Sequence, residues 1–534
     1  MTRISVRPII AFAATLALTA GVASPQDSLR APTRKRSLGE DLQLFSQVLN
    51  QIRVNHPDSL DTHELLMSAI EGMVAAADPH SYVIPSTRLD SAKEAEMRAG
   101  RLYPVPIDFR FVGGAPLVSA VAPGSRAVSL DILPGDELVA VNGRAVAATS
   151  AYELEIALSG PKSSTASLVL RRRRADGTIA RLERIVTRER VEESSAVPAA
   201  VMLDAQTGYV RVTTFVGDKI ADDLHAALGR LEGSGMRRLI LDLRGNGGGR
   251  VDEAKRIAGE FLPRGTIVYT SSGRKAEVTD TGRVQRSFWQ SERRYPIVLM
   301  VDDGTASASE LVAGALQDHD RALIVGRPTF GKSLIMQTFP LTDGSRMALV
   351  IGQIRTPCGR VIQRAYHNES RRDYYRDAGQ SSDTTGRPAC HTDRGRTVYG
   401  GGGIVPDVTL RETFTPSWLA RASERGLLIT WTAGFVDRSA ARLTSVDALA
   451  GAPTLDASEL ASFRSYAALS DVVVPADSAG SETLTQALVR TIAYSKFGER
   501  GYYRLVALTD PAVKAATQAF DRAGELLGTA QPPE

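Results

Sequence analysis

Residues 297–317 read IVLMVDDGTASASELVAGALQ, a run of five apolar residues, a short polar turn and a segment with apolar residues at helical spacing. The apolar run is typical of a buried strand, and the segment from about Ala306 to Gln317 is typical of a helix. The alternation continues on both sides, because strand-like stretches cover Leu239–Leu243 and Ala322–Val325. Strands that alternate with helices predict a layered, mixed α/β core.

Ser307 stands at the junction between this strand and this helix, within Gly304-Thr305-Ala306-Ser307-Ala308-Ser309-Glu310. The amide of Ala308 belongs to the N–H groups that a helix start leaves unpaired, and helix starts stabilise negative charge. Ser307 is therefore placed to attack a carbonyl whose oxygen would develop charge beside Ala308. Serine also favours helix starts as a simple cap, and the turn alone does not decide between these interpretations.

A second element is residues 241–249, LDLRGNGGG, in which a buried strand runs into three consecutive glycines. Glycines let a backbone approach a substrate closely and turn its N–H groups inward. This turn could therefore supply a second donor to the same oxygen. A tight strand-to-helix turn without a chemical role is the alternative.

Residues 326–333, GRPTFGKS, match the phosphate-binding pattern of two glycines followed by Lys and Ser. A phosphate-binding loop must open a helix, whereas Ser333–Leu341 is β-prone, which argues against an NTPase. Lys332 is instead a candidate general base, provided that burial lowers its pKa from about 10.4 toward about 7–8. A solvated surface lysine is the alternative.

The histidines do not support a serine–histidine site. His319 follows Ser307 by twelve positions at the end of the same helix, a distance of roughly 18 Å at 1.5 Å per residue. The other six histidines show no metal-ligand spacing. We therefore expect neither a metal nor any other cofactor.

The regions outside the core differ from it in composition and in predicted secondary structure. Residues 1–23 are typical of a signal peptide, with a basic start, an apolar stretch over Ile9–Ala20 and small residues before a cleavage point. An uncleaved anchor is the alternative interpretation of this segment. The remaining regions are a helical region at 24–99, a β-rich module at 100–188, the core at 199–411 and a mainly helical C-terminal domain at 412–534.

Composition is that of an ordinary soluble globular protein. The 534 residues carry a net charge of +4, with 43% hydrophobic and 23% charged residues, which fits two to four domains. The arginines are scattered apart from Arg171–Arg174, so the charge pattern argues against nucleic-acid binding. The two cysteines, Cys358 and Cys390, could pair in an oxidising compartment or remain free thiols.

Taken together, these segments resemble the C-terminal processing (tail-specific) peptidase family of serine peptidases over about Leu42–Leu410. The resemblance implies a crotonase-like α/β protease core with an inserted PDZ domain at residues 100–188. The strongest matches are residues 241–249, 307–310, 317–318, 325–332, 356–363 and 400–408.

Roles for individual residues are implied by the resemblance. Ser307 would attack the scissile carbonyl while Lys332 takes its proton, which gives an acyl-enzyme intermediate. The amides of Ala308 and of Gly248 or Gly249 would hold the oxyanion. Asp318 matches an acidic position of the family and would support the site.

The sequence departs from the family pattern in the residues that follow Lys332. The family usually carries a glutamine four residues after it, and here that position is Met336, with Gln337 one residue late. Strand residues alternate faces, so Gln337 should point away from Lys332 unless a bulge corrects the register. Either Gln337 or another group supports Lys332, or activity is weakened.

A second departure lies in the loop that holds carboxylates in PDZ domains, where Pro104 and Pro106 flank Val105. Proline has no N–H to offer a terminal carboxylate. The sequence therefore leaves open whether this loop captures free C-termini, and a gating or docking role is the alternative.

We predict an exported serine endopeptidase of the periplasm or cell envelope, acting on protein or peptide substrates that it contacts partly through their C-terminal segments. A catalytically impaired peptide-binding scaffold of the same fold is the alternative, motivated by Met336. Peripheral membrane contact, a homo-oligomer and an adaptor protein stay open.

Overall fold

The computed structural model describes residues 37–84, 91–98, 101–112, 115–122, 125–146, 148, 151–173, 178–189, 196–286, 292–366, 371–376, 383–411, 415–451 and 455–528. The predicted signal peptide lies outside these ranges. The chain divides into two units, Met1–Ile70 and Glu71–Glu534. No helix within the described ranges is long and apolar enough to cross a membrane.

The predicted N-terminal helices are confirmed. Helix α1 (Leu38–Asn55) begins with a capping box in which Ser37 and Glu40 each bind the other's backbone amide. None of its residues is buried. Helix α2 (Thr62–Ala77) ends immediately before Asp78.

The β-rich module is an antiparallel sheet with strand order β2-β3-β4-β6-β7, to which β5 adds on β4. Asn142 and Gly143, a dipeptide typical of tight hairpins, join β4 to β5, and both residues have positive φ, 49° and 76°. The elements are β2 (Ile107–Val112), β3 (Ala115–Val121), β4 (Glu137–Val141), β5 (Arg144–Ala145), α4 (Ala151–Leu158), β6 (Thr165–Arg173) and β7 (Ile179–Thr187).

The core is a six-stranded sheet in the order β19-β14-β13-β10-β9-β8, parallel except for β8. Parallel strands need crossover helices, which explains the alternation seen in the sequence. Its strands are β8 (Ala199–Met202), β9 (Thr207–Arg211), β10 (Arg238–Asp242), β13 (Ile297–Val301), β14 (Leu323–Gly326) and β19 (Val408–Thr409), and its crossover helices are α5 (Ile220–Gly233), α6 (Val251–Gly259) and α7 (Ala308–Asp318).

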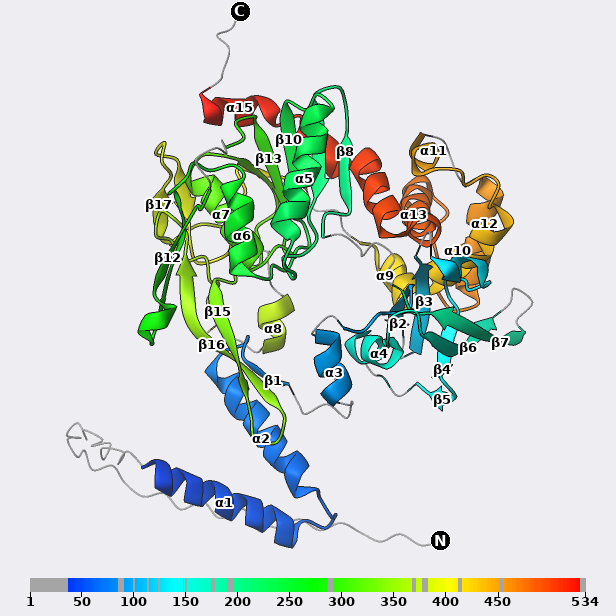
Figure 1. Cartoon of the computed structure of the whole chain (residues 1–534), viewed down its shortest axis with the longest axis horizontal. Coiled ribbons are helices and arrows are strands. Elements are labelled where there is room, and N and C mark those ends of the chain that lie inside the picture. The colour runs from blue at the N-terminus through cyan, green and yellow to red at the C-terminus, as the bar shows by residue number, and fades with distance from the viewer. Residues whose placement is uncertain are drawn as a thin grey trace, which may run out of the picture. The chain divides into compact units, whose positions relative to one another are not determined.

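Both faces of this sheet are buried, each by different helices (Figure 1). Leu241 and Leu299 belong to the cluster formed with α5, α6 and α7. The alternate residues Ile240 and Val298 pack instead with Phe520 and its neighbours from α14 (Pro511–Thr517) and α15 (Phe520–Leu527). The last two helices of the predicted C-terminal region thus pack on the core sheet.

The remaining C-terminal helices have a core of their own, which includes Trp431 and Phe463. Helix α13 (Ser478–Thr509) contributes to both cores, and Gly498 interrupts it with a positive φ of 68°. Glycine adopts this conformation without a Cβ penalty, so the helix can change direction there. The other members are α9 (Ser417–Glu424), α10 (Leu427–Arg438), α11 (Val446–Gly451) and α12 (Ala457–Ala468).

A second sheet brings the start of the second unit next to the lysine segment. Strand β16 (Arg346–Arg355) is its centre, and it pairs with β1 (Tyr82–Ile84), β11 (Ile267–Gly273) and β15 (Leu334–Pro340), all antiparallel. Strand β12 (Asp280–Arg283) extends the sheet on β11. Further short elements are α3 (Ser91–Arg98), α8 (Arg371–Arg376), β17 (Ala389–His391) and β18 (Thr397–Tyr399).

The two cysteines, left open by the sequence, form a disulfide. Cys358 and Cys390 have Cα atoms 6.2 Å apart, within the usual range for this bond. The bond joins the turn after β16 to β17.

The role of α15 in the core gives a first prediction. Phe520 is 4% exposed in the cluster on the second face of the sheet, so Phe520→Ala should lower the free energy of unfolding of the core by about 3–5 kcal/mol. Denaturant unfolding of the full chain measures this. Leu469→Ala, at an 86% exposed position, is the control and should change stability by less than about 0.5 kcal/mol. Equal, small effects of both substitutions would show that α15 does not close the sheet.

Candidate active site

Ser307 occupies the strand-to-helix turn that the sequence predicts, between β13 and α7. Its backbone has φ 57° and ψ −120°, a conformation that non-glycine residues rarely adopt. The strain is held in place because the N–H of Ser307 donates to Glu310 Oε2 at 2.8 Å. The turn therefore presents a half-buried hydroxyl at the start of α7.

The glycine-rich loop after β10 is bound to this turn. The N–H of Gly245 donates to Asp302 Oδ1 at 2.6 Å, and the hydroxyl of Thr305 donates to the carbonyl of Leu243 at 2.9 Å. The N–H of Ala306 donates to the carbonyl of Asn246 at 3.0 Å. Three hydrogen bonds thus fix the loop against the residues that precede Ser307.

Gly248 lies directly against the predicted oxyanion donor. A Cβ at this position would sit 2.7 Å from the Ala308 nitrogen and 2.6 Å from the Ala306 oxygen, and φ is +89°, so glycine is required. The N–H of Gly248 itself donates to Asn246 Oδ1 at 2.9 Å. In the described chain the amides of Ala308 and Gly249 have no hydrogen-bond partner, so they remain the pair of donors available to a ligand.

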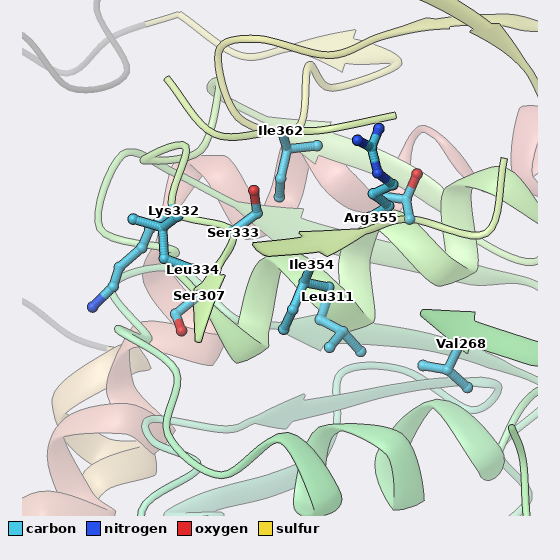
Figure 2. A pocket seen from close by; sticks show the side chains of 10 residues that line it. Val268, Ser307, Leu311, Lys332, Ser333, Leu334, Ile354, Arg355 and Ile362 are labelled. Atoms are coloured by element: carbon cyan, nitrogen blue, oxygen red, sulfur yellow. The ribbon is translucent and has the colours of Figure 1, made fainter. Parts of the chain in front are cut away.

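Lys332 shares a pocket with Ser307, and both residues stand at one end of it (Figure 2). Burial lowers the pKa of Lys332, and the charges of Glu310 and Asp78 oppose that shift. No hydrogen bond joins the Ser307 hydroxyl to the Lys332 amine in the described residues. The lysine thus meets the chemical requirement that the sequence sets for a base, an amine whose burial favours the neutral form.

Glu310 connects the two segments. Its carboxylate is fully buried, and Oε2 accepts hydrogen bonds from the N–H groups of both Ser307 and Lys332, each at 2.8 Å. Oε1 accepts from the Thr329 hydroxyl at 2.5 Å and the Gly331 N–H at 2.8 Å. Burial raises the pKa of Glu310 to about 7, although these four donors act to lower it.

Glu310 is a site residue that the sequence patterns left without a role, although a signal was present. Serine followed three positions later by glutamate at a helix start is the capping-box pattern. Here the glutamate reaches back to the serine amide and also holds the lysine segment.

The phosphate-loop alternative fails on structural context. Gly331 and Lys332 lead into strand β15 rather than a helix. A phosphate-binding loop needs the amides of a following helix start.

Asp318 and His319 lie at the end of α7 away from Ser307. Asp318 is 1% exposed, pairs with Arg360 at 2.6 Å and accepts from the Cys358 N–H at 3.0 Å. It therefore holds the turn that contributes Thr356 to the pocket. His319 contacts Asp393 and the carbonyl of Ile267, not Ser307.

Neither Met336 nor Gln337, which follow the lysine on β15, supplies a polar partner for its amine. Met336 is half-buried, and Gln337 is exposed, with a side chain that makes no hydrogen bond in the described part of the chain. A register shift does occur between Ile335 and Met336, but the additional residue, Ile351, belongs to β16. The alternation along β15 is therefore unchanged, and Gln337 stays on the exposed side.

Comparison with known proteins shows to which family the chain belongs. The model of peptidase family S41 matches residues 206–367. The carboxyl-terminal-processing protease of Synechocystis is 33% identical over 309 residues, covering 56% of this chain and 68% of that protein. The chain belongs to peptidase family S41.

Two further similarities are to a plant protein and to a solved structure. Carboxyl-terminal-processing peptidase 2, chloroplastic, of Arabidopsis thaliana is 33% identical over 322 residues. The match covers 56% of the chain described here and 59% of the length of the Arabidopsis protein. The solved photosystem II D1 C-terminal processing protease covers 72% of this chain and 90% of its own, with 25% identity and a TM-score of 0.35.

A buried ion cluster of this S41 peptidase, which sequence reasoning missed, supports the glycine loop. Asp242 is fully buried at the end of β10, with Arg211 Nη1 and Arg244 Nη2 each 2.7 Å from its carboxylate. Burial acts to raise the pKa of Asp242, but the two arginines outweigh it and hold the pKa at about 2. Arg244 also pairs with Asp510 at 3.1 Å, which links the loop to the start of α14.

The Glu310 carboxylate gives a second prediction. In Glu310→Gln, the side-chain NH₂ would point at backbone N–H groups, so at least one pair of hydrogen bonds is lost at a cost of about 1–3 kcal/mol for each unsatisfied group. We expect peptidase activity to fall about 100-fold because Ser307 and Lys332 lose their fixed relation. Activity on an unfolded protein measures this, with Glu424→Gln, at an exposed position on α9, as the matched control. Activity within twofold of wild type would refute the role of Glu310.

Proposed function

We propose that this S41 peptidase hydrolyses peptide bonds with Ser307 as nucleophile and Lys332 as general base. The observation that carries the proposal is the single oxygen Glu310 Oε2, which accepts from the amides of both residues and so holds them together. The neutral amine of Lys332 takes the hydroxyl proton as Ser307 Oγ attacks the carbonyl. The ammonium then returns the proton to the leaving amine, and water hydrolyses the acyl-enzyme.

The oxyanion is assigned to the amides of Ala308 and Gly249. Ala308 lies at the start of α7, where the helix end favours negative charge. Gly248 supports the site by its lack of a side chain rather than by its N–H, which Asn246 takes. Two preorganised donors typically make the largest contribution to such a reaction.

The pocket beside Ser307 suggests the preferred residue before the scissile bond. Apolar side chains form much of its lining, with Ser307 and Lys332 at one end and Ser333 and Arg355 also contributing, as Figure 2 shows. The apolar part of this lining favours an apolar side chain, because a polar group buried there would lose its hydration. The apolar lining residues are Val268, Leu311, Leu334, Ile354 and Ile362.

The β-rich module is proposed to be a PDZ domain that does not read a terminal carboxylate. Pro104 and Pro106 have no N–H, and the N–H of Ile107 donates to the carbonyl of Val105 at 2.9 Å. The carbonyls of Pro104 and Pro106 accept from Glu189 and Ala122. The loop thus offers a carboxylate fewer N–H donors than a loop of glycines would, and a docking or gating role for the module fits better than capture of C-termini.

Export, to the periplasm or cell envelope, remains part of the proposal. The Cys358–Cys390 disulfide supports it, because such bonds persist mainly in oxidising compartments. Proteins and peptides of that compartment are the proposed substrates.

The alternative is an impaired peptide-binding scaffold, which Met336 favours because the lysine amine has no side-chain partner on β15. Wild type and Met336→Gln distinguish the two functions. Cleavage by wild type excludes the scaffold, whereas cleavage by Met336→Gln alone identifies a disabled protease.

The proposed catalytic dyad, Ser307 and Lys332, gives a third prediction. Ser307→Ala, Lys332→Ala and Lys332→Arg should each lose more than about 99% of the activity on an unfolded protein, because general-base catalysis contributes about 10²–10⁴-fold. Lys332→Arg keeps the positive charge but cannot act as a base.

The pH profile tests the same assignment. The base works as a neutral amine, so kcat/KM should rise with pH through the pKa of Lys332, which burial places below the ordinary lysine value of about 10.4. Substantial activity in Lys332→Arg would contradict the assignment.

The proline loop gives a fourth prediction. A peptide substrate with a free C-terminal carboxylate and the same peptide with a C-terminal amide should have kcat/KM values within about twofold, because Pro104 and Pro106 have no N–H and the N–H of Ile107 is already bound. Cleavage of the two peptides is compared by mass spectrometry. A tenfold preference for the free acid would show that another part of the module binds the carboxylate.

A further inference from the structure

A buried chain of side chains runs from the segment after Lys332 to the start of the second unit. Gln363 Oε1 accepts from the N–H of Ser333 at 3.1 Å, and Gln363 Nε2 donates to the Tyr374 hydroxyl at 2.9 Å. The Tyr374 oxygen lies 2.9 Å from His80 Nε2, and His80 Nδ1 lies 3.2 Å from the Tyr375 hydroxyl. Three separate segments of the chain thus meet behind the lysine.

The three side chains that link these segments are buried. Tyr374 is 1% exposed, His80 3% and Gln363 9%. Burying three polar side chains is costly unless their hydrogen bonds are satisfied. A purely apolar packing would fill the same space without that cost, so the polar chain needs an explanation beyond packing.

The hydrogen bonds have one consistent direction. Gln363 donates to the Tyr374 oxygen, so the Tyr374 proton is left to point at His80 Nε2, since the described residues offer it no other acceptor. His80 is then assigned as neutral, with its proton on Nδ1 directed at Tyr375. The Tyr375 hydroxyl in turn donates to the carbonyl of Pro79 at 3.2 Å.

Aromatic contacts bring the same residues against the lysine loop. The ring of Phe330, two positions before Lys332, lies 6.1 Å from the His80 ring and 5.8 Å from the Tyr374 ring, both edge to face. Arg364 lies over the Tyr374 ring at 4.1 Å and over Phe330 at 5.5 Å. The segment around Lys332 is therefore held on both sides. Phe330, before the lysine, is held by contacts of its ring, and Ser333, after it, is held by the hydrogen bond of its amide.

We propose that Gln363, Tyr374 and His80 form a positioning relay that fixes the direction of the Lys332 amine toward Ser307. They are positioning residues rather than catalytic ones, since they act through the segment Phe330–Ser333. The relay holds the segment around Lys332 in place, a role that neither Met336 nor Gln337 fills on β15. The proposal rests on Lys332 being the base.

The turn that carries His80 also carries a charge that acts on the lysine. Asp78 Oδ1 accepts from the N–H groups of His80 and Ser81, at 2.8 and 2.7 Å. The charged groups that act on the pKa of Lys332 are Glu310 from α7 and Asp78 from this turn, both against the effect of burial. A shift of the turn would thus change both the direction and the surroundings of the amine.

Tyr374→Phe is the sharpest test, because it removes one hydroxyl and keeps the ring contacts with Phe330 and His80. We expect kcat to fall between about 10- and 100-fold at pH 7 with KM changed less than twofold, as for a misplaced catalytic group. The acid limb of the kcat/KM profile should move to higher pH, because a loosely held amine regains solvent and is harder to deprotonate. Tyr82→Phe, at a 43% exposed position on β1, is the matched control and should match wild type.

A second readout removes dependence on the substrate. The rate at which a fluorophosphonate labels Ser307 reports the activation of the hydroxyl, and it should show the same loss and the same shift of the acid limb. Gln363→Ala should behave likewise, and the double variant should be no worse than the poorer single variant, since both act through one relay. Thermal melting of each variant checks the fold.

The outcomes separate this proposal from the function it rests on. If Lys332→Arg keeps activity, the assignment of the base is wrong. If Lys332→Arg is inactive while Tyr374→Phe retains wild-type rates, or loses rate equally at every pH with its acid limb unmoved, the relay is refuted and the dyad stands.

Discussion

The structure depends on one buried carboxylate, that of Glu310. An ionised carboxylate without water is costly, and four donors offset that cost here: the amides of Ser307, Gly331 and Lys332 and the hydroxyl of Thr329. The donors come from the turn before α7 and the loop before β15, which are distant in sequence. The same bonds hold Ser307 in its unusual backbone conformation, so the strain at Ser307 and the position of Lys332 have a common cause.

A second buried carboxylate, that of Asp242, holds the glycine-rich loop after β10 in a similar way. Asp242 holds Arg211 and Arg244 at the end of β10, and Arg244 reaches Asp510 at the start of α14. Arg211 also donates to the carbonyl of Arg244, which fixes the first residue of the loop. The C-terminal helices therefore bear on the active site as well as on the second face of the sheet. Removing one member would leave buried charges unpaired, which is far more costly than removing a surface ion pair.

Patterns in the sequence predicted the local elements and their chemistry. Apolar runs and glycine turns located β10, β13 and α7, and the β-prone stretch after Lys332 argued against a phosphate loop. They missed the place of α15, because an amphipathic helix shows which side is apolar and not which sheet covers it. Glu310, Gln363 and His80 were missed as site residues for a similar reason, since their partners lie on other segments. The role of a buried polar residue is set by the groups it bonds to, and long-range hydrogen bonds leave no periodic trace.

The proposed lysine base and the proposed substrate pocket share one physical condition. Lys332 can serve as a base only while its amine is kept from water, and it lines the same pocket beside Ser307 as the apolar residues Leu334 and Ile362. An apolar substrate side chain that enters this pocket would displace water from the same surface. Desolvation disfavours the ammonium, so occupation of the pocket would favour the neutral amine that the reaction needs. Recognition and base strength would then be coupled through burial, and the enzyme would be most reactive with the residue it accommodates best.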